Sequence, residues 1–311
     1  MRRASDYGRR LPSGVDAVPA VLSTHPQIRR QQVLCETLSR FELATPTDRY
    51  HRIAKENLLR WKLEASVHDS DANSPLTIEV LPLDWGEATL MLTRRHGQRF
   101  AVLNMANPVV PGGNYAEGAP AQEENMFRRT DCHFSLDRAL LHSATERYLL
   151  RITRLLEARD GRVMLDMASP RTCLRGPEDR TRSDLGYRWL GAEEIFPFLE
   201  LRAAAVRRAD TQRFAAGEMR RRIAAQLDTL RSAGVRHAVL GAFGCGAFGN
   251  PAEQVARIYR DEIQRRATDF SVIAFAIFNG ERGPDNFTPF VEASHWHKCR
   301  LPDASLLRRP T

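Results

Sequence analysis

Short hydrophobic runs alternate with amphipathic stretches over most of the chain. Runs rich in β-branched and aromatic residues predict strands at 77–83, 88–93, 100–105, 163–167, 237–243 and 270–278. Apolar residues at helical spacing predict helices near 136–158, 195–208, 212–233 and 251–266. This alternation indicates an α/β layer fold with a largely buried sheet, in which ligands lie at the carboxyl ends of strands.

The N-terminal part has a different pattern. Residues 1–26 are rich in Arg, Gly, Pro and Ser without periodicity, which is typical of a mobile basic arm. Helical patterns follow at 27–41 and 46–64, and the polar stretch 69–75 separates them from the rest. We therefore expect an arm at 1–26, a helical extension at 27–75, an α/β core at 76–293 and a tail at 294–311.

The charge of the chain comes almost entirely from arginine. The formal net charge is +8, and only three of the 46 basic residues are lysines. The arginines are spread along most helical patterns, so we interpret them as solvated helix faces with some preference for anionic ligands. No motif interleaves aromatic and basic residues, so we expect no nucleic-acid partner.

The cysteines and the chain start indicate where the protein works. Five cysteines are odd in number and widely spaced, which fits a reducing compartment better than a disulfide scaffold. His295, His297 and Cys299 lie close together, but no further ligands are spaced to complete a metal site. No signal-peptide core or membrane-length apolar run is present. We expect a cytoplasmic monomer without a membrane partner, or a protein exported without a cleaved signal.

The glycine-rich segment 241–250 predicts an anion site. Gly244 to Gly249 match GxGxxG between a predicted strand and a predicted helix. Glycines let the backbone approach a phosphate, and free N–H groups at the helix start, with Asn250 as cap and Pro251 in the first turn, would face an anion. A tight structural turn is the alternative. The residues predicted to bind a diphosphate are Gly241, Ala242, Phe243, Gly244, Cys245, Gly246, Ala247 and Phe248.

A dinucleotide-binding Rossmann domain fits this segment less well. Its motif opens a βαβ unit whose second strand ends in an acidic residue, whereas the next predicted strand here ends at Phe278-Asn279. Only about 60 residues follow the motif, too few for the rest of such a domain. The segment is therefore interpreted as a phosphate loop of another architecture.

A second glycine-rich segment, Pro111-Gly112-Gly113-Asn114, leads into Gln122-Glu123-Glu124. The turn exposes amides close to a sugar, and Asn114 tolerates a left-handed conformation. Adjacent glutamates diverge by about 100 degrees on a helix, so we expect different tasks for them. One would hold ribose hydroxyls, while the other, near an apolar surface, would keep a raised pKa and donate a proton. The alternative is an acidic first helical turn that favours the helix dipole.

The two segments together resemble a known family. Gly112-Gly113-Asn114, seven residues and then Gln122-Glu123-Glu124 resemble the GGG-x(6–8)-QEE element of poly(ADP-ribose) glycohydrolases, most closely the bacterial type. Residues 240–251 are similar to the diphosphate loop of that family. Phe275-Ala-Ile277 with Asn286-Phe287 resembles its last strand and tail. The resemblance spans roughly 76–291 and implies a macrodomain, a mixed sheet between helices that grips ADP-ribose.

The resemblance also implies roles for single residues. Glu124 matches the catalytic acid, Glu123 the neighbour that binds ribose hydroxyls, and Phe248 the aromatic side chain on the distal ribose. Asn107 matches a ribose-binding asparagine, and Gly112, Gly113, Asn114 and Gln122 complete the predicted substrate-binding set. The family needs no metal or other cofactor.

The implied activity is hydrolysis that removes ADP-ribose from poly- or mono-ADP-ribosylated proteins. Asn114 replaces the third glycine of the motif, and residues 167–208 fall where family members vary, so polymer and mono-linked substrates, including arginine-linked ones, both stay open. The alternative function is a reader that binds ADP-ribose without cleaving it, although the intact glutamate pair argues against it. The expected partner is ADP-ribose or an ADP-ribosylated protein.

Overall fold

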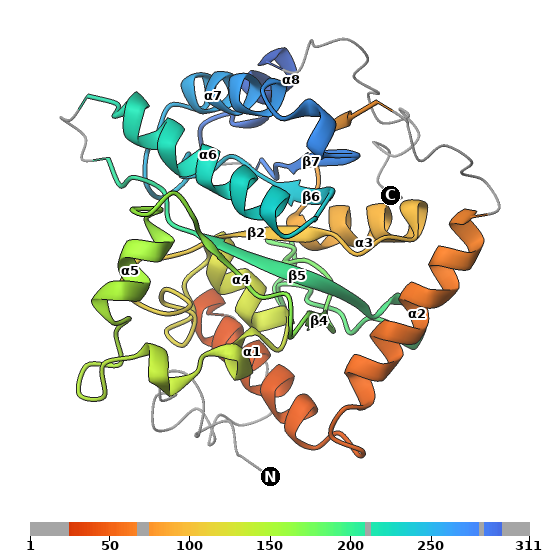
Figure 1. Cartoon of the computed structure of the whole chain (residues 1–311). Coiled ribbons are helices and arrows are strands. Elements are labelled where there is room, and N and C mark those ends of the chain that lie inside the picture. Colours follow the sequence, from red (N-terminus) through yellow and green to blue (C-terminus); the bar gives the residue numbers. More distant parts are fainter. Residues whose placement is uncertain (1–24, 67–74, 209–212, 280–282, 294–311) are drawn as a thin grey trace.

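A mixed seven-stranded sheet runs through the computed structural model, which describes residues 25–66, 75–208, 213–279 and 283–293 (Figure 1). The strands lie in the order β1-β7-β6-β2-β5-β3, with β4 also paired to β5. The first five of these are parallel neighbours, while β3 and β4 run antiparallel to β5. The bounds are β1 (Thr77–Leu81), β2 (Ala101–Met105), β3 (Met164–Leu165), β4 (Arg171–Cys173), β5 (Phe196–Ala203), β6 (His237–Leu240) and β7 (Val272–Ala276).

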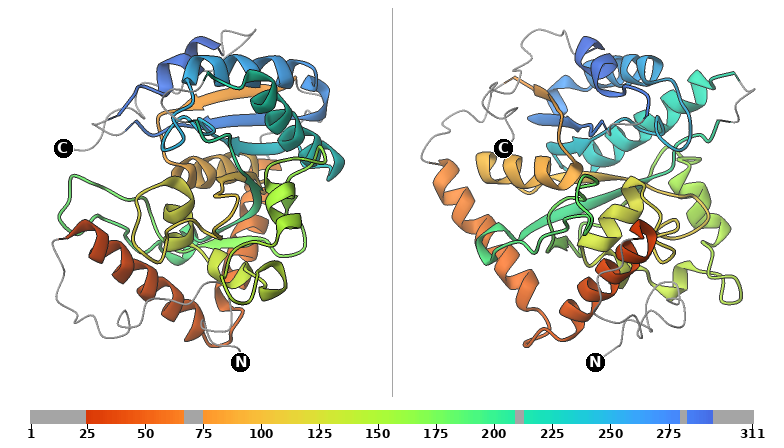
Figure 2. Two further views of the ribbon diagram at one scale, coloured as in Figure 1. Left: turned by 90° about the vertical axis from the view of Figure 1, so that its left-hand side faces the viewer. Right: turned by 180° about the vertical axis from the view of Figure 1, so that it is seen from behind.

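Helices cover both faces of the sheet (Figures 1 and 2). Successive residues of a strand point to opposite faces. Ala101 and Leu103 of β2 therefore pack with one group of helices, and Val102 packs with the other. The first group is α6 (Ala216–Ser232), α7 (Ala252–Gln264) and α8 (Phe287–Ala293), and the second is α1 (Pro26–Glu42), α2 (Arg49–Ser66), α3 (Trp85–His96) and α4 (Gln122–Arg129).

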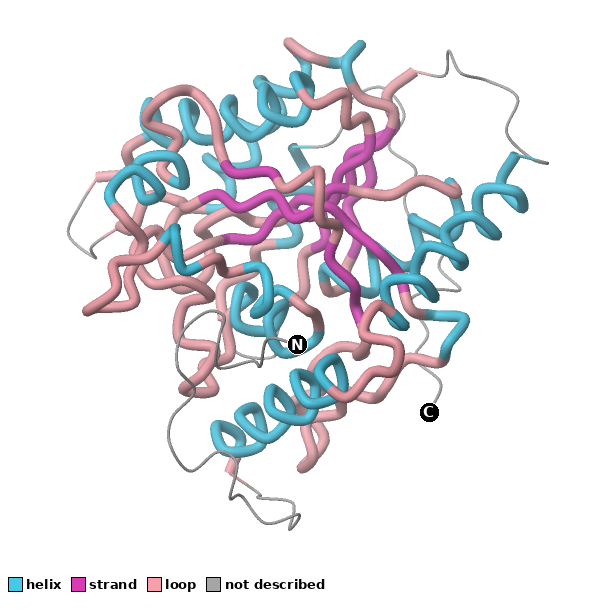
Figure 3. Tube along the Cα trace, turned by 60° about the horizontal axis from the view of Figure 1, so that its bottom comes forward, coloured by secondary structure: helices cyan, strands magenta, loops and turns pink. Residues whose placement is uncertain are grey.

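The strands form a single layer between helices in Figure 3. The predicted α/β fold with a mixed sheet sandwiched between helices is confirmed, and it is macrodomain-like. The predicted N-terminal helices are also present as α1 and α2. Leu34 and Leu38 of α1 and Trp61 of α2 share an apolar cluster with Val102, so both helices pack against the sheet layer.

The strand predicted at 88–93 is wrong, because this run belongs to α3. The Asp84 side chain caps the helix by accepting from Glu87 N at 2.8 Å. Gly97 ends it with a φ of 58°. The buried positions Ala88, Thr89, Leu92 and Thr93 follow helical spacing.

The helix predicted at 195–208 is wrong as well, because this run forms the parallel strand β5. Every residue of β5 is buried. Glu200 and Arg202 interrupt the apolar run in the sequence, but their charges pair with each other inside the protein. The helix predicted at 136–158 is shortened to α5 (Leu150–Leu156), which follows two 3₁₀ turns.

Some predictions lie outside the described residues. These are most of the arm at 1–26, most of the linker at 69–75, and the His295 to Cys299 cluster in the tail. Among the described helices, none combines the length and apolar character that crossing a membrane requires.

Candidate functional site

Two loops follow neighbouring parallel strands and meet at one edge of the sheet. The first glycine loop (residues 106–121) follows β2, and the second glycine loop (residues 241–250) follows β6. A Cβ placed on Gly241 would lie 2.6 Å from Met105 Cε. The start of the second glycine loop therefore contacts the end of β2, the strand that precedes the first glycine loop. The structure thus brings together the two segments that the sequence singled out.

The first turn of α4 ties this helix to the end of β2. Gln122 Oε1 accepts from Met105 N at 2.9 Å, and Gln122 Nε2 donates to Leu103 O at 2.9 Å. Both polar atoms of the Gln122 amide are therefore engaged by the strand, so this side chain anchors α4 and is not aimed at a ligand.

Glu123 binds the start of the first glycine loop, and Glu124 binds its middle. Glu123 Oε2 accepts from Asn107 N at 2.7 Å, and Glu124 Oε1 accepts from Asn114 N at 3.0 Å. Glu123 is 3% exposed and Glu124 is 8% exposed. Both belong to the acidic first turn of α4, and both carboxyl groups reach toward Gly113, where a Cβ would lie 2.3 Å from Glu124 Oε1 and 3.2 Å from Glu123 Oε2.

The turn beside Glu124 requires glycine at two positions. Gly112 and Gly113 have φ of 70° and 60°. A Cβ on Gly113 would lie 2.3 Å from Glu124 Oε1, so the carboxylate rests directly on the backbone there. Asn114 could tolerate a left-handed conformation, but its φ is not positive, and the two glycines make the turn. Asn114 is exposed, so its side chain lies at the surface beside Glu124.

Asn107 uses half of its side chain within its own loop. Asn107 Oδ1 accepts from Val109 N and Val110 N, each at 2.9 Å. Its Nδ2 donates to no acceptor in the part of the chain that the structure describes, so the amide nitrogen is the group that can reach a ligand. Asn107 is only partly buried, which leaves this nitrogen accessible.

The raised pKa was expected for the proton donor, but it belongs to Glu123, which the resemblance matches to ribose binding. Burial, and then the neighbouring carboxylate of Glu124, raise the pKa of Glu123 well above its usual range. The N–H of Asn107 and the guanidinium of Arg202 oppose this rise. Glu123 Oε1 is buried and has no hydrogen-bond partner among the described residues. Glu123 is thus the carboxyl group most inclined to keep its proton.

A buried charge network lies close enough to influence Glu123. Glu200 Oε1 accepts from Arg202 Nε at 2.7 Å and from Asn104 Nδ2 at 2.8 Å. Glu200 Oε2 accepts from Arg171 Nε at 2.9 Å. Burial raises the pKa of Glu200, but these two guanidinium groups outweigh burial and lower it to about 2. The sequence reasoning missed this network, whose only signal was a Glu-x-Arg pair inside an apolar run.

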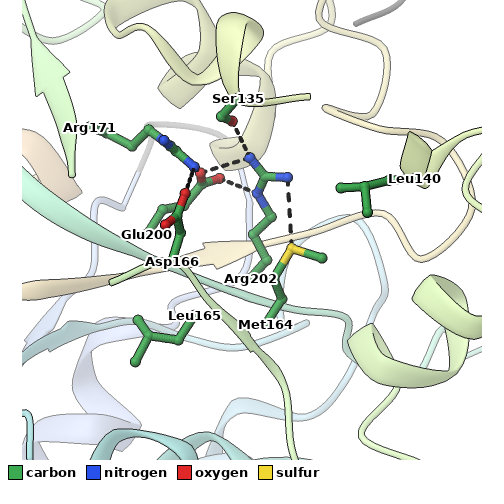
Figure 4. Close-up of a pocket in the computed structure, with 8 residues that line it drawn as sticks. All are labelled: Ser135, Leu140, Met164, Leu165, Asp166, Arg171, Glu200 and Arg202. Carbon is green, nitrogen blue, oxygen red and sulfur yellow. Dashed lines mark hydrogen bonds and ion pairs between the residues drawn. The ribbon is translucent and has the colours of Figure 1, made fainter. Parts of the chain in front are cut away.

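The same network lines a small pocket beside β3 and β5 (Figure 4). Its volume is about 210 Å³, and Figure 4 shows Arg202 reaching toward Ser135 and Met164 across it. None of the lining residues belongs to either glycine loop. The pocket is therefore separate from the edge at which the two loops meet.

The second glycine loop leaves several backbone donors open. Asn250 N bonds back to Gly244 O at 3.1 Å, and Cys245 N bonds to Ala242 O at 3.0 Å. Other N–H groups of the loop donate to no acceptor within the described residues, namely those of Gly244, Gly246, Ala247 and Phe248. Clustered free amides of this kind attract anions. This loop is therefore suited to bind an anion at the shared edge.

Two details of this loop differ from expectation. Asn250 does not cap α7, because its Nδ2 donates to Val206 O at 2.7 Å and to Gly244 O at 2.9 Å. Pro251 is the N-cap residue, and the helix begins at Ala252. Asn250 therefore fastens the loop to the segment that follows β5.

The side chains of the second glycine loop divide between core and surface. Phe243 and Cys245 point into the core, where they are 0% and 2% exposed. Burial raises the pKa of Cys245 to about 12, so its thiol stays neutral and inert. Phe248 is only partly buried, and its predicted contact with a ligand stays a prediction. No group of three His, Cys, Asp or Glu side chains suited to a metal ion occurs in the described ranges.

Comparisons with known proteins agree with these motifs. Residues 27–171 match the family model for the microbial-type PARG, catalytic domain, where PARG is poly(ADP-ribose) glycohydrolase. The structure is similar to PARG from Thermomonospora curvata, with 23% identity and a TM-score of 0.58 over 85% of this chain and 98% of that chain. A comparison with curated proteins found no match.

Two solved complexes are also similar. The Thermomonospora curvata PARG bound to the inhibitor ADP-HPD shares 24% identity, with a TM-score of 0.56 over 85% of this chain and 98% of that chain. PARG from Deinococcus radiodurans in complex with ADP-ribose shares 21%, with a TM-score of 0.51 over 80% of this chain and 92% of that chain. The family match includes the first glycine loop and both glutamates, and the structural matches extend the fold over most of the chain. Residues 27–171 are therefore similar to the microbial-type PARG catalytic domain, and the described chain shares the fold of the solved bacterial PARGs.

Proposed function

We propose that this chain is a glycosidase that hydrolyses the ribosyl C1 bond of ADP-ribose linkages. One observation carries the proposal. Two glutamates, each bound by a backbone N–H, lie at the sheet edge where the second glycine loop, with its open N–H groups, begins. The pairing supplies an acid–base group beside an anion site, which is what cleavage of a nucleotide sugar requires. The match of residues 27–171 to the microbial-type PARG catalytic domain supports it.

The ligand would bind across both loops. The diphosphate would accept from the open N–H groups of the second glycine loop, with the Phe248 ring against the distal ribose. Asn107 Nδ2 and the protonated Glu123 would donate to ribose oxygens. The relatives solved with ADP-HPD and ADP-ribose support a ligand of this class.

Glu124 would act as general acid and then as general base. It donates a proton to the leaving atom while the C1 bond breaks and positive charge develops on the ribose. The diphosphate in the second glycine loop stabilises that charge. Water then attacks C1, and its proton passes to the Glu124 carboxylate, which restores the acid. Glu123 is the more buried of the two and keeps its proton more readily, so it fits a binding task better.

Turnover assays would test this proposal. The chain is incubated with poly(ADP-ribose) and with proteins carrying single ADP-ribose units, and free ADP-ribose is measured by chromatography. Release from either substrate supports a glycosidase, and the ratio of the two rates defines its preference. Calorimetric binding of ADP-ribose without any release would overturn hydrolysis and favour a reader.

A further inference from the structure

An unusual set of contacts holds the part of the first glycine loop that leads into α4. Five successive backbone carbonyl groups, those of residues 116–120, each accept a hydrogen bond from a side chain outside the loop. The donors are Gln31 to Ala116 O at 3.1 Å, Gln27 to Glu117 O at 2.8 Å, Arg30 to Gly118 O at 3.5 Å, Arg128 to Ala119 O at 2.7 Å and Arg180 to Pro120 O at 3.1 Å. Loop carbonyls more often face water. Here the side-chain donors hold residues 116–120 of the loop in place instead.

Three of the donors come from one face of α1. Gln27, Arg30 and Gln31 are spaced i, i+3 and i+4, so they project to the same side of the helix. Gly118 lets the loop backbone approach that helix, because a Cβ there would lie 2.3 Å from Gln27 O. α1 lies beside α4 in Figures 1 and 2, and Thr37 Oγ1 donates to Arg128 O at 2.8 Å between them.

The three arginines share one carboxylate. Glu178 accepts from Arg30 at 2.8 and 3.1 Å and from Arg180 at 2.9 Å, and it lies 3.8 Å from the Arg128 guanidinium. Its side chain is only 6% exposed. Burial raises the pKa of Glu178, but hydrogen bonds from Arg30 and Tyr187 and the nearby positive charges lower it to about 2. A single ionised group therefore orients the donors to three consecutive carbonyls.

We propose that Glu178, its three arginines, Gln27 and Gln31 form a clamp that positions the first glycine loop for catalysis. The clamped carbonyls lie between Asn114, whose N–H binds Glu124, and the start of α4, which carries Glu124. The clamp thus fixes the acid relative to the turn on which its carboxylate rests. Among the described residues, none of its hydrogen bonds or ion pairs reaches the second glycine loop. This inference rests on the proposed function and assigns positioning residues to its site.

The double variant Gln27→Ala/Gln31→Ala tests the clamp with little risk to folding. Neither glutamine is fully buried, and both substitutions suit a helix. Misplacement of a catalytic group by a fraction of an ångström lowers rate far more than affinity, so kcat should fall roughly 10-fold. The KM and the Kd for ADP-ribose should change less than about threefold. Gln98→Ala, at an exposed position before β2, is the matched control and should keep full kcat.

Two outcomes would overturn the clamp. One is a kcat within twofold of the parent chain, and the other is a parallel loss of ADP-ribose affinity and thermal stability, which would indicate a general folding role. Hydrogen exchange at 113–120 separates this test from that of the proposed function. If the parent chain releases no ADP-ribose, faster exchange in the double variant still supports the clamp, and unchanged exchange refutes it.

Discussion

The two glycine loops use glycine for opposite purposes. In the first loop, glycines let the backbone press against a carboxylate, and side chains from α1, α4 and the segment around Glu178 hold the carbonyls. In the second loop, glycines leave N–H groups without acceptors in the described structure, and Asn250 provides its main fastening. The first loop is organised before any ligand arrives, and the second offers donors that a ligand can satisfy. An acid–base group needs a fixed position, as the first loop provides, and anion binding needs open donors, as the second loop provides.

The largest effect should come from the acid that the first loop holds. Glu124→Gln keeps the size of the side chain and an oxygen for the Asn114 N–H, but it cannot donate and regain a proton. We expect kcat to fall roughly 10²- to 10⁴-fold while the Kd for ADP-ribose stays within a few-fold. Single-turnover release of ADP-ribose and calorimetric binding measure the two quantities. Near-parental turnover would show that another group supplies the proton.

Gly113→Ala should break the first loop almost as strongly. The added methyl would lie 2.3 Å from Glu124 Oε1 at a position with a φ of 60°, so the carboxylate or the turn must move. We expect a loss of roughly 10²-fold in kcat with a smaller change in ADP-ribose affinity. If affinity fell as much as kcat, the first loop would contribute to ligand binding as well as to catalysis.

Gly244→Ala is the counterpart in the second loop. Its Cβ would lie 2.5 Å from Ala205 Cβ and 2.7 Å from Asn250 Nδ2, at a φ of 73°. The strain displaces the fastening of the loop, so we expect the Kd for ADP-ribose to rise roughly 10-fold with a smaller effect on the bound-state rate. Gly246→Ala, whose Cβ meets no atom within 4 Å, should leave thermal stability unchanged. Any loss of affinity in that control would therefore report direct contact with the ligand.

The protonation of Glu123 predicts a smaller effect, on stability. Because the pKa of Glu123 is raised on folding, the unfolded chain loses this proton first as pH rises above about 4.5, and stability then falls until the folded pKa is passed. Glu123→Gln removes this loss. Its Tm relative to the parent chain should rise from pH 4.5 to pH 8, by about 2 to 4 °C for each kcal/mol. A Tm difference that did not vary with pH would contradict a raised pKa.

Features that lie within one stretch of the sequence could be predicted, whereas features that depend on contacts between distant elements could not. Both glycine loops, the strands before them and the glutamate pair could be read because each signal lies in one stretch. The cap at Asp84 and the stop at Gly97 were readable too, and they would have identified α3. The buried strand β5 could not be predicted from such local signals, because the partners that neutralise its charges come from other elements.

The chemistry of the site was likewise predictable only where it depends on neighbouring residues in the sequence. Adjacent glutamates predict two environments, but only burial shows that Glu123 is the one with the raised pKa. The clamp around Glu178 joins α1, α4 and a loop that follows β4, and no periodicity in the sequence connects them. Packing determines both features, so they become visible only in three dimensions.

The smallest expected effect concerns substrate choice at Asn114. Its side chain is exposed beside Glu124 and its φ is not positive, so Asn114→Gly relieves no strain and should leave the fold and ADP-ribose affinity nearly unchanged. It removes a side chain from the surface where the group linked to the ribose must lie. If Asn114 limits the room for a second ADP-ribose unit, the ratio of polymer to mono-linked turnover should rise by a few-fold, which corresponds to about 1 kcal/mol. An unchanged ratio would move selectivity away from the first loop, and the variable segment 167–208 would become the next place to look for it.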